Sequence, residues 1–171
     1  MTPRRFRKLP TATVFGVAVA ALALVAGGCG SSNDDNSTGT NASAATASPG
    51  TLATGKTDLG TILVGAKGRT LYLFEKDKNG KSACSGACAA VWTPFTSAGS
   101  QVSTAGSADK AKVTTTKRSD GKLQVVYAGH PLYYYVPDTQ AGQTSGEGLD
   151  QFGAEWYVVS PAGKKVEESG E

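Results

Sequence analysis

The sequence predicts a mainly β protein whose folded part is one small antiparallel domain of two pseudo-symmetric repeats, over residues 57–167. Two observations predict this fold. Beyond residue 56 the chain consists of short apolar runs separated by Gly, Asp, Asn and Lys, with no long stretch of helical period. An aromatic pattern in the first part of this region also recurs in the second part at a constant spacing. A region of this length suffices for one small domain.

Residues 1–28 have the layout of a cleaved export signal. Four basic residues lie between positions 4 and 8, an apolar stretch covers residues 14–25, and only small residues precede Cys29. A membrane-spanning helix needs about 20 apolar residues. The stretch over residues 11–28 is shorter and ends in glycines, so we do not expect a permanent transmembrane helix.

This segment resembles a bacterial lipoprotein signal, in which the cysteine is acylated and becomes the first residue of the mature chain. The resemblance implies that Cys29 carries a lipid that binds the membrane and holds the protein on the outer face of the bacterial cytoplasmic membrane. A plain signal peptide and an uncleaved anchor are the alternatives. The signal contains four of the 17 basic residues, which leaves 13 basic against 14 acidic residues. No basic run remains for binding phosphates, and nucleic acid is not an expected partner.

Residues 29–56 are predicted to be the lipidated cysteine and a disordered tether. Their composition is mainly Ser, Thr, Asn, Ala and Gly, with Leu52 as the large apolar side chain. Such a segment cannot bury a core. A flexible coil of this length spans roughly 25–30 Å, which separates the domain from the bilayer. A glycosylated Ser/Thr-rich segment is the alternative.

Six apolar runs have the length and composition of strands. Gly65–Gly68 lies between the first two runs and Ala128–Pro131 between two later ones, so each pair is predicted to form a hairpin. A short helical turn is expected near the two cysteines that follow the second run. The six predicted strands cover residues 61–64, 70–74, 112–116, 123–127, 132–136 and 156–159.

The two repeats are related residue by residue. At an offset of 61, Tyr72 corresponds to Tyr133, Phe74 to Tyr135 and Asp77 to Asp138. After an insertion of three residues, Trp92 corresponds to Trp156. The predicted boundaries are residues 57–99 for repeat one, 100–121 for a connector and 122–166 for repeat two. We expect the two units to pack with approximate twofold symmetry, each covering the apolar face of the other.

The motif Tyr-x-aromatic-x-x-Asp therefore occurs twice, and the segment Cys84–Trp92 contains a Cys-x-Gly-x-Cys-Ala-x-x-Trp pattern in which Ser85, Gly86 and Ala87 separate the cysteines. In these features the chain resembles a bacterial family of predicted lipoproteins called the secreted repeat of unknown function. The resemblance covers nearly all of the folded part. It implies a location and an architecture but supplies no reaction.

The motif residues have a structural and a functional interpretation. The aromatic residues are expected mainly to pack in the core, because each such ring buries 150 to 250 Å² in typical cases; a stacking surface for a sugar or quinone is the alternative. Asp77 and Asp138 follow their strands immediately and are expected to accept hydrogen bonds from turn N–H groups. A catalytic pair formed by the two aspartates is the alternative. The segment Asp77–Gly80 begins like a calcium loop but lacks the later ligands.

Cys84 and Cys88 remain once Cys29 is acylated, and a pair of cysteines outside the cytoplasm is expected to form a disulfide. Regular helix geometry separates Cβ atoms four residues apart by more than a disulfide permits, so a distorted turn is expected. The alternative is a copper or thiol-disulfide redox site with His130 as a third ligand. His130 lies in a predicted turn, and we expect it to be an ordinary exposed residue.

These observations favour a non-enzymatic, lipid-anchored module of the cell envelope that binds a small ligand or an envelope component, or has a structural role. The sequence contains no Gly-x-Ser-x-Gly, His-Glu-x-x-His, P-loop or dinucleotide-binding motif, and a single histidine limits acid–base designs. No cofactor is expected; copper belongs to the redox alternative.

Overall fold

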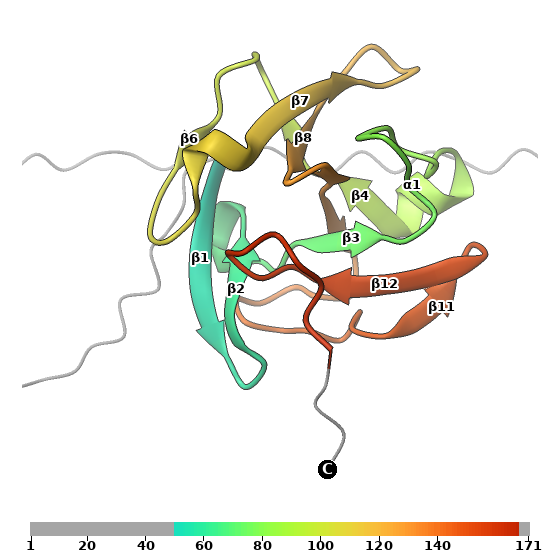
Figure 1. Ribbon diagram of the computed structural model, residues 1–171. Coiled ribbons are helices and arrows are strands. Elements are labelled where there is room, and N and C mark those ends of the chain that lie inside the picture. Colours follow the sequence, from blue (N-terminus) through green and yellow to red (C-terminus); the bar gives the residue numbers. More distant parts are fainter. Residues whose placement is uncertain (1–49, 168–171) are drawn as a thin grey trace, which may run out of the picture. The chain divides into compact units, whose positions relative to one another are not determined.

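The computed structural model describes residues 50–167, which form short strands with three short helical segments between them (Figure 1). The helical segments are η1 (Ala66–Gly68), α1 (Ala87–Val91) and η2 (Lys110–Lys112). The strands are β1 (Thr51–Thr57), β2 (Gly60–Val64), β3 (Tyr72–Phe74), β4 (Trp92–Pro94), β5 (Thr96–Ser97), β6 (Ser103–Thr104), β7 (Val113–Lys117), β8 (Leu123–Tyr127), β9 (His130–Pro131), β10 (Tyr133–Tyr135), β11 (Leu149–Gln151) and β12 (Ala154–Val158). The predicted mainly β fold, with a short helix near the cysteine pair, is confirmed.

The central sheet joins the two repeats by exchanging their strands. Its order is β11-β12-β3-β10-β4, and all its pairs are antiparallel. β3 of the first repeat lies between β12 and β10 of the second, and β4 of the first repeat pairs with β10. The repeats are therefore interlocked, which is a closer relation than the expected packing of one apolar face against the other. The pseudo-twofold axis passes between the paired residues Tyr72 and Tyr133.

Two equivalent hairpins flank this sheet. β1 pairs with β2, and β7 pairs with β8, both antiparallel. Each hairpin donates a backbone hydrogen bond to the other repeat. Leu63 N–H donates to the Val159 carbonyl at 2.7 Å, and Val125 N–H donates to the Phe95 carbonyl at 2.8 Å. The flanking hairpins are thus fixed by the same exchange that builds the central sheet.

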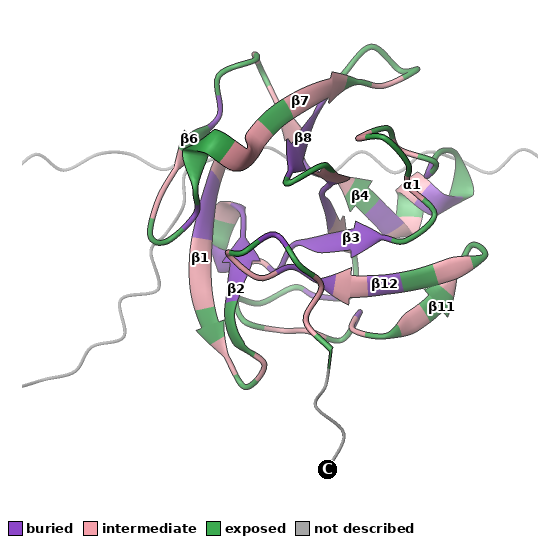
Figure 2. Ribbon diagram, in the orientation of Figure 1, coloured by how far each residue is buried: buried purple, intermediate pink, exposed green. Residues whose placement is uncertain are grey.

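The core contains two apolar clusters that meet along β3, all three of whose residues are buried (Figure 2). Side chains alternate across a strand. Tyr72 and Phe74 accordingly belong to a cluster rich in aromatic residues, whereas Leu71 and Leu73 belong to a mainly aliphatic one. Both faces of this strand are therefore covered.

The domain begins earlier than predicted. The tether was expected to extend to residue 56, but Thr51–Thr57 form β1, in which Leu52 and Ala53 are fully buried. Leu52 and Ala53 are the two buried residues among the seven of β1, so its largely polar composition concealed the strand. Cys29 and residues 30–49 of the predicted tether lie outside the described residues.

The predicted connector, residues 100–121, contains the beginning of the second repeat. Within it β6 pairs with β1 in parallel, and β7 forms the second flanking hairpin with β8. The first predicted hairpin is shorter than expected. A single bridge, Val64↔Thr70, joins its arms, and β3 then enters the central sheet. The second is a true hairpin whose turn is Ala128-Gly129, and His130 and Pro131 already belong to β9.

Candidate functional site

The repeated aromatic residues form a continuous stack of four rings in the core. Trp156 stacks on Phe74 with a centroid distance of 4.0 Å and on Trp92 with one of 3.9 Å; Trp92 in turn stacks on Tyr135 at 4.4 Å. The rings come alternately from the first and the second repeat. Both indoles are fully buried. The stacked rings therefore pack the two repeats against each other.

The acidic residue of each motif binds the tyrosine of the other repeat. The Tyr72 hydroxyl donates to Asp138 Oδ2 at 2.5 Å, and the Tyr133 hydroxyl donates to Asp77 Oδ2 at 2.7 Å. Both tyrosines are fully buried. Burial and the neighbouring carboxylate raise the pKa of each tyrosine, so both hydroxyls keep the proton that they donate. We call these two hydrogen bonds the Tyr–Asp locks.

Each carboxylate also fixes the loop that follows it. Asp77 Oδ1 accepts the N–H of Ala83 at 2.7 Å, and Asp138 Oδ1 accepts the N–H of Ser145 at 3.2 Å. These contacts are of the turn-stabilising kind expected for both residues. The segment that begins like a calcium loop closes instead as a tight turn, in which Asn79 has a φ of 53° between the bridged residues Lys78 and Lys81.

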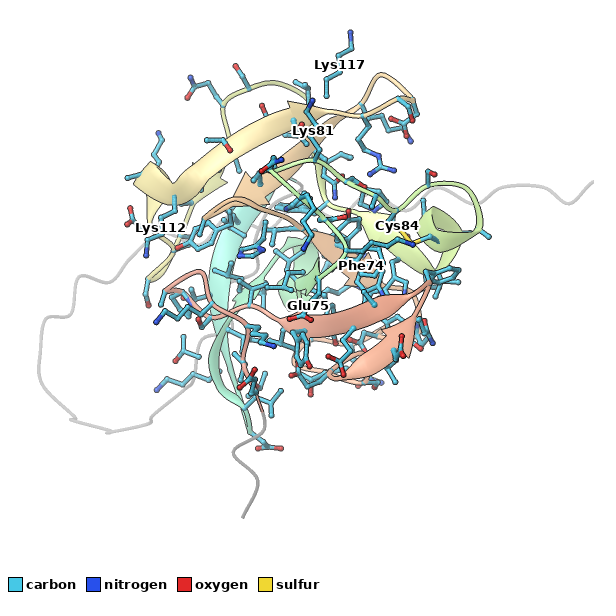
Figure 3. All side chains as sticks on the ribbon, turned by 45° about the vertical axis from the view of Figure 1, so that its right-hand side comes forward. Phe74, Glu75, Lys81, Cys84, Lys112 and Lys117 are labelled. Atoms are coloured by element: carbon cyan, nitrogen blue, oxygen red, sulfur yellow. A yellow bond between two sulfur atoms is a disulfide. The ribbon has the colours of Figure 1, made fainter. Side chains whose placement is uncertain are left out.

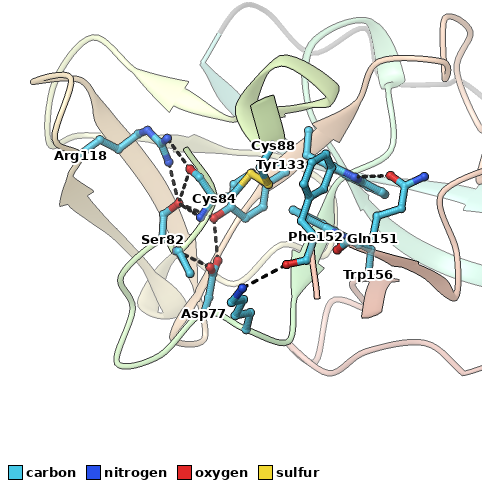
Figure 4. The surroundings of a disulfide bond; sticks show 12 residues. Asp77, Ser82, Cys84, Cys88, Arg118, Tyr133, Gln151, Phe152 and Trp156 are labelled. Atoms are coloured by element: carbon cyan, nitrogen blue, oxygen red, sulfur yellow. Dashed lines mark hydrogen bonds between the residues drawn. A yellow bond between two sulfur atoms is a disulfide. The ribbon is translucent and has the colours of Figure 1, made fainter. Parts of the chain in front are cut away.

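The disulfide loop is held by a buried cation, Arg118, that no sequence motif marks (Figure 4). Cys84 and Cys88 form a disulfide with their Cα atoms 5.3 Å apart, at the start of α1. Arg118, whose side chain is only 6% exposed, donates to the Cys84 carbonyl at 2.7 Å and to Ser82 Oγ at 2.7 Å. The Tyr133 hydroxyl lies 2.7 Å from the same Ser82 oxygen, so the disulfide loop and one Tyr–Asp lock share a single network.

A second residue without a sequence signal joins the two indoles. The side-chain oxygen of Gln151 accepts from Trp92 Nε1 at 2.9 Å, and its backbone oxygen accepts from Trp156 Nε1 at 3.0 Å. One residue of β11 therefore satisfies the buried N–H groups of both tryptophans.

An open depression of about 650 Å³ lies beside the end of β3, where Figure 3 labels Phe74 and Glu75. We call it the His130 depression. Its wall combines β3 and the following loop with His130 of β9 and a C-terminal turn; it consists of Leu73, Phe74, Glu75, Asp77, Lys78, His130, Gly163, Lys164, Lys165 and Glu167. His130 is half-buried here rather than an exposed turn residue, and burial lowers its pKa.

A smaller depression of about 450 Å³ lies beside the end of β10, with Arg69, Tyr134 and Asp138 in its wall. We call it the Arg69 depression. The Arg69 side chain donates to the Asp138 carbonyl from Nε and to the Tyr135 carbonyl from Nη2, both at 2.9 Å. Its guanidinium carbon lies 4.6 Å from the centre of the Tyr134 ring, a cation–π distance.

The structure separates the residues of the alternative sites. Asp77 and Asp138 line different depressions, and each carboxylate is occupied by a tyrosine of the other repeat. Among residues 50–167 no group of three His, Cys, Asp or Glu side chains is placed to hold a metal ion. Cys84 and Cys88 are bonded to each other, and His130 lies in the wall of the His130 depression.

The pKa of Asp77 predicts how stability changes with pH. Burial raises this pKa from 3.8 to about 6, although the N–H of Ala83 and the hydroxyl of Tyr133 oppose the shift. The native state therefore holds the proton more tightly than the unfolded chain. The stability that this proton contributes is present below the unfolded pKa of 3.8 and is lost as the pH rises to the native pKa of about 6. Asp77→Asn lacks this titration. The difference in free energy of unfolding between Asp77→Asn and wild type should therefore shift in favour of the variant as the pH rises from about 4 to about 7. Urea unfolding at a series of pH values measures this difference, and a constant difference would contradict the assignment.

Comparison with known proteins gives one match, to a family model. The model described as a secreted repeat of unknown function matches residues 53–96 and again residues 114–160. The first range begins within β1 and the second within β7. Each range includes a motif tyrosine and its aspartate. No curated protein and no solved structure matches the chain.

Proposed function

Because the chain belongs to the family of secreted repeats of unknown function, we propose that it is a lipid-anchored, extracytoplasmic module of the cell envelope that binds a ligand or partner without catalysing a reaction. The family description supports a location outside the cytoplasm. The basic, apolar and small-residue segments before Cys29 support export and acylation at that residue. Within the described part of the chain, no helix has the length and apolar character to cross a membrane.

The Tyr–Asp locks are the observation that carries the binding role. A catalytic carboxylate must reach a proton of the substrate directly or through one water. Both motif carboxylates instead accept a hydroxyl and a backbone N–H from within the domain. The repeated motif thus serves to join the repeats, and the open depressions beside the ends of β3 and β10 are left as surfaces for recognition.

Acylation of Cys29 tests the anchor. The full chain is produced in a bacterial host that is fed an alkyne-labelled fatty acid, and the label is then detected on the purified protein. We expect the wild type to be labelled and to fractionate with membranes, and Cys29→Ser to be unlabelled and unprocessed. The double variant Cys84→Ser/Cys88→Ser is the matched control, because it removes cysteines without touching the signal, and it should keep the label. Wild-type protein that is unlabelled and free in the medium would refute the anchor.

A further inference from the structure

The two depressions are equivalent positions of the two repeats. The offset of 61 that relates the motifs also places Arg69 on His130 and Asp77 on Asp138. Leu73, Glu75 and Lys78 of the His130 depression correspond in the same way to Tyr134, Val136 and Thr139, all of which line the Arg69 depression. One difference between the two sites is the residue that each receives from the other repeat, Arg69 in one and His130 in the other.

In the Arg69 depression the protein supplies its own guanidinium. Arg69 donates to the carbonyls of Tyr135 and Asp138, and the Tyr135 carbonyl also accepts the Asp138 N–H at 3.2 Å. This pair of carbonyls, three residues apart, matches the planar fork of donors that distinguishes arginine from lysine. The site is thus built for a guanidinium and filled by one.

The His130 depression has the same carbonyls without that guanidinium. The Phe74 carbonyl accepts the Asp77 N–H at 3.0 Å, as its counterpart does. Among the described residues no side chain donates to the Phe74 or Asp77 carbonyl, and the His130 side chain makes no hydrogen bond. The shorter imidazole leaves an open space of about 650 Å³ in front of the two residues.

We propose that the His130 depression binds a guanidinium group from outside the domain, which donates to the carbonyls of Phe74 and Asp77. The inference rests on the proposed binding role and names its ligand chemistry. The group can belong to an arginine side chain of an envelope protein or to a small arginine-like molecule.

The charges around the depression set the expected strength. Glu75, Asp77 and Glu167 balance Lys78, Lys164 and Lys165, and Lys165 bridges two of the carboxylates at 2.9 Å each. Net charge therefore contributes little, and recognition depends on the two carbonyls. Leu73 is the equivalent of Tyr134, whose ring contacts Arg69 in the other depression. A guanidinium in the His130 depression would therefore lack this cation–π contact. We expect dissociation constants in the millimolar range, about 4 kcal/mol of binding free energy.

Titration with ethylguanidinium tests the proposal. The full-length protein, purified in detergent, is labelled with ¹⁵N and followed by amide spectra. We expect saturable shifts at residues 74–78, and ethylammonium, a cation without the planar fork, should bind at least about tenfold more weakly. N-acetyl-arginine amide, which mimics an arginine within a protein, is then compared with free arginine. If the natural ligand is a protein side chain, N-acetyl-arginine amide should bind at least as well as free arginine.

His130→Arg is the matched variant, since it gives the second site the residue that fills the first. The new guanidinium should occupy the position in front of the two carbonyls and abolish saturable shifts at residues 74–78. Should this variant fail to fold, the comparison of ethylguanidinium with ethylammonium on the wild type decides. Absence of saturation in the wild type, equal binding of both cations, or unchanged binding to a folded His130→Arg protein would overturn the proposal. The acylation test reads the lipid alone, so either test can fail without the other.

Discussion

Neither repeat should fold alone. Cutting the chain between Gly99 and Ser100 gives two fragments, of which the first contains β3 and β4 and the second contains β10 and β12. In the intact protein β3 pairs with β10 and β12, and β4 pairs with β10. In an isolated fragment β3, β4 and β10 lose all their partners in the central sheet, and β12 keeps only β11. Unpaired buried backbone groups and exposed aromatic rings are both strongly unfavourable. We expect each fragment to lack dispersed amide resonances and a cooperative unfolding transition.

Mixing the fragments in equal amounts is the control. The cut lies outside the strands, so all strand pairs can form again between the two fragments. The mixture should regain the native amide spectrum and a cooperative, concentration-dependent transition, because association now contributes to stability. A single fragment that unfolds cooperatively by itself would show that the repeats are independent units.

Trp156→Ala should cause the largest loss of stability of any single substitution in the aromatic stack. The indole is fully buried and contacts Phe74 and Trp92 face to face and Tyr133 edge to face. Removing a buried tryptophan costs about 3–5 kcal/mol, and a domain with a typical stability of about 5–15 kcal/mol would lose a large part of it. Urea unfolding measures the loss, and near-UV circular dichroism reports the loss of the stacked rings.

Phe152→Gly is the matched control in the same hairpin. Phe152 lies at the turn between β11 and β12, is 40% exposed and has a φ of 61°, which glycine adopts without strain. Removing this ring should change the free energy of unfolding by no more than about 1 kcal/mol. An equally small loss for Trp156→Ala would mean that the stack is not a main source of stability.

The repeated motifs could be read from the sequence, but the exchange of strands could not. A constant offset shows which residues are equivalent, whereas it does not show whether Phe74 meets the tryptophan of its own repeat or Trp156 of the other. β1 escaped prediction because its only large apolar residue, Leu52, follows a long polar stretch. The three-residue strands β4 and β11 are too short to show a period of two.

The candidate site was only partly predictable for similar reasons. The equivalence of Arg69 and His130 is present in the offset, so a complete comparison of the repeats would have found it. Arg118 and Gln151 carry no such signal, because their roles depend on contacts over 34 and 59 positions of sequence, with Cys84 and Trp92. Only the folded chain brings these polar groups to the donors and acceptors that need them.

The interlocked sheet has a consequence for the origin of the protein. A lone ancestral copy of the unit could not have satisfied its own β3-type strand, so it would have worked as a pair of identical chains that traded strands around a dyad. The arrangement is the one expected after duplication and fusion of the gene for such a homodimer. The two halves now differ, since position 69 is an arginine and its equivalent position 130 is a histidine.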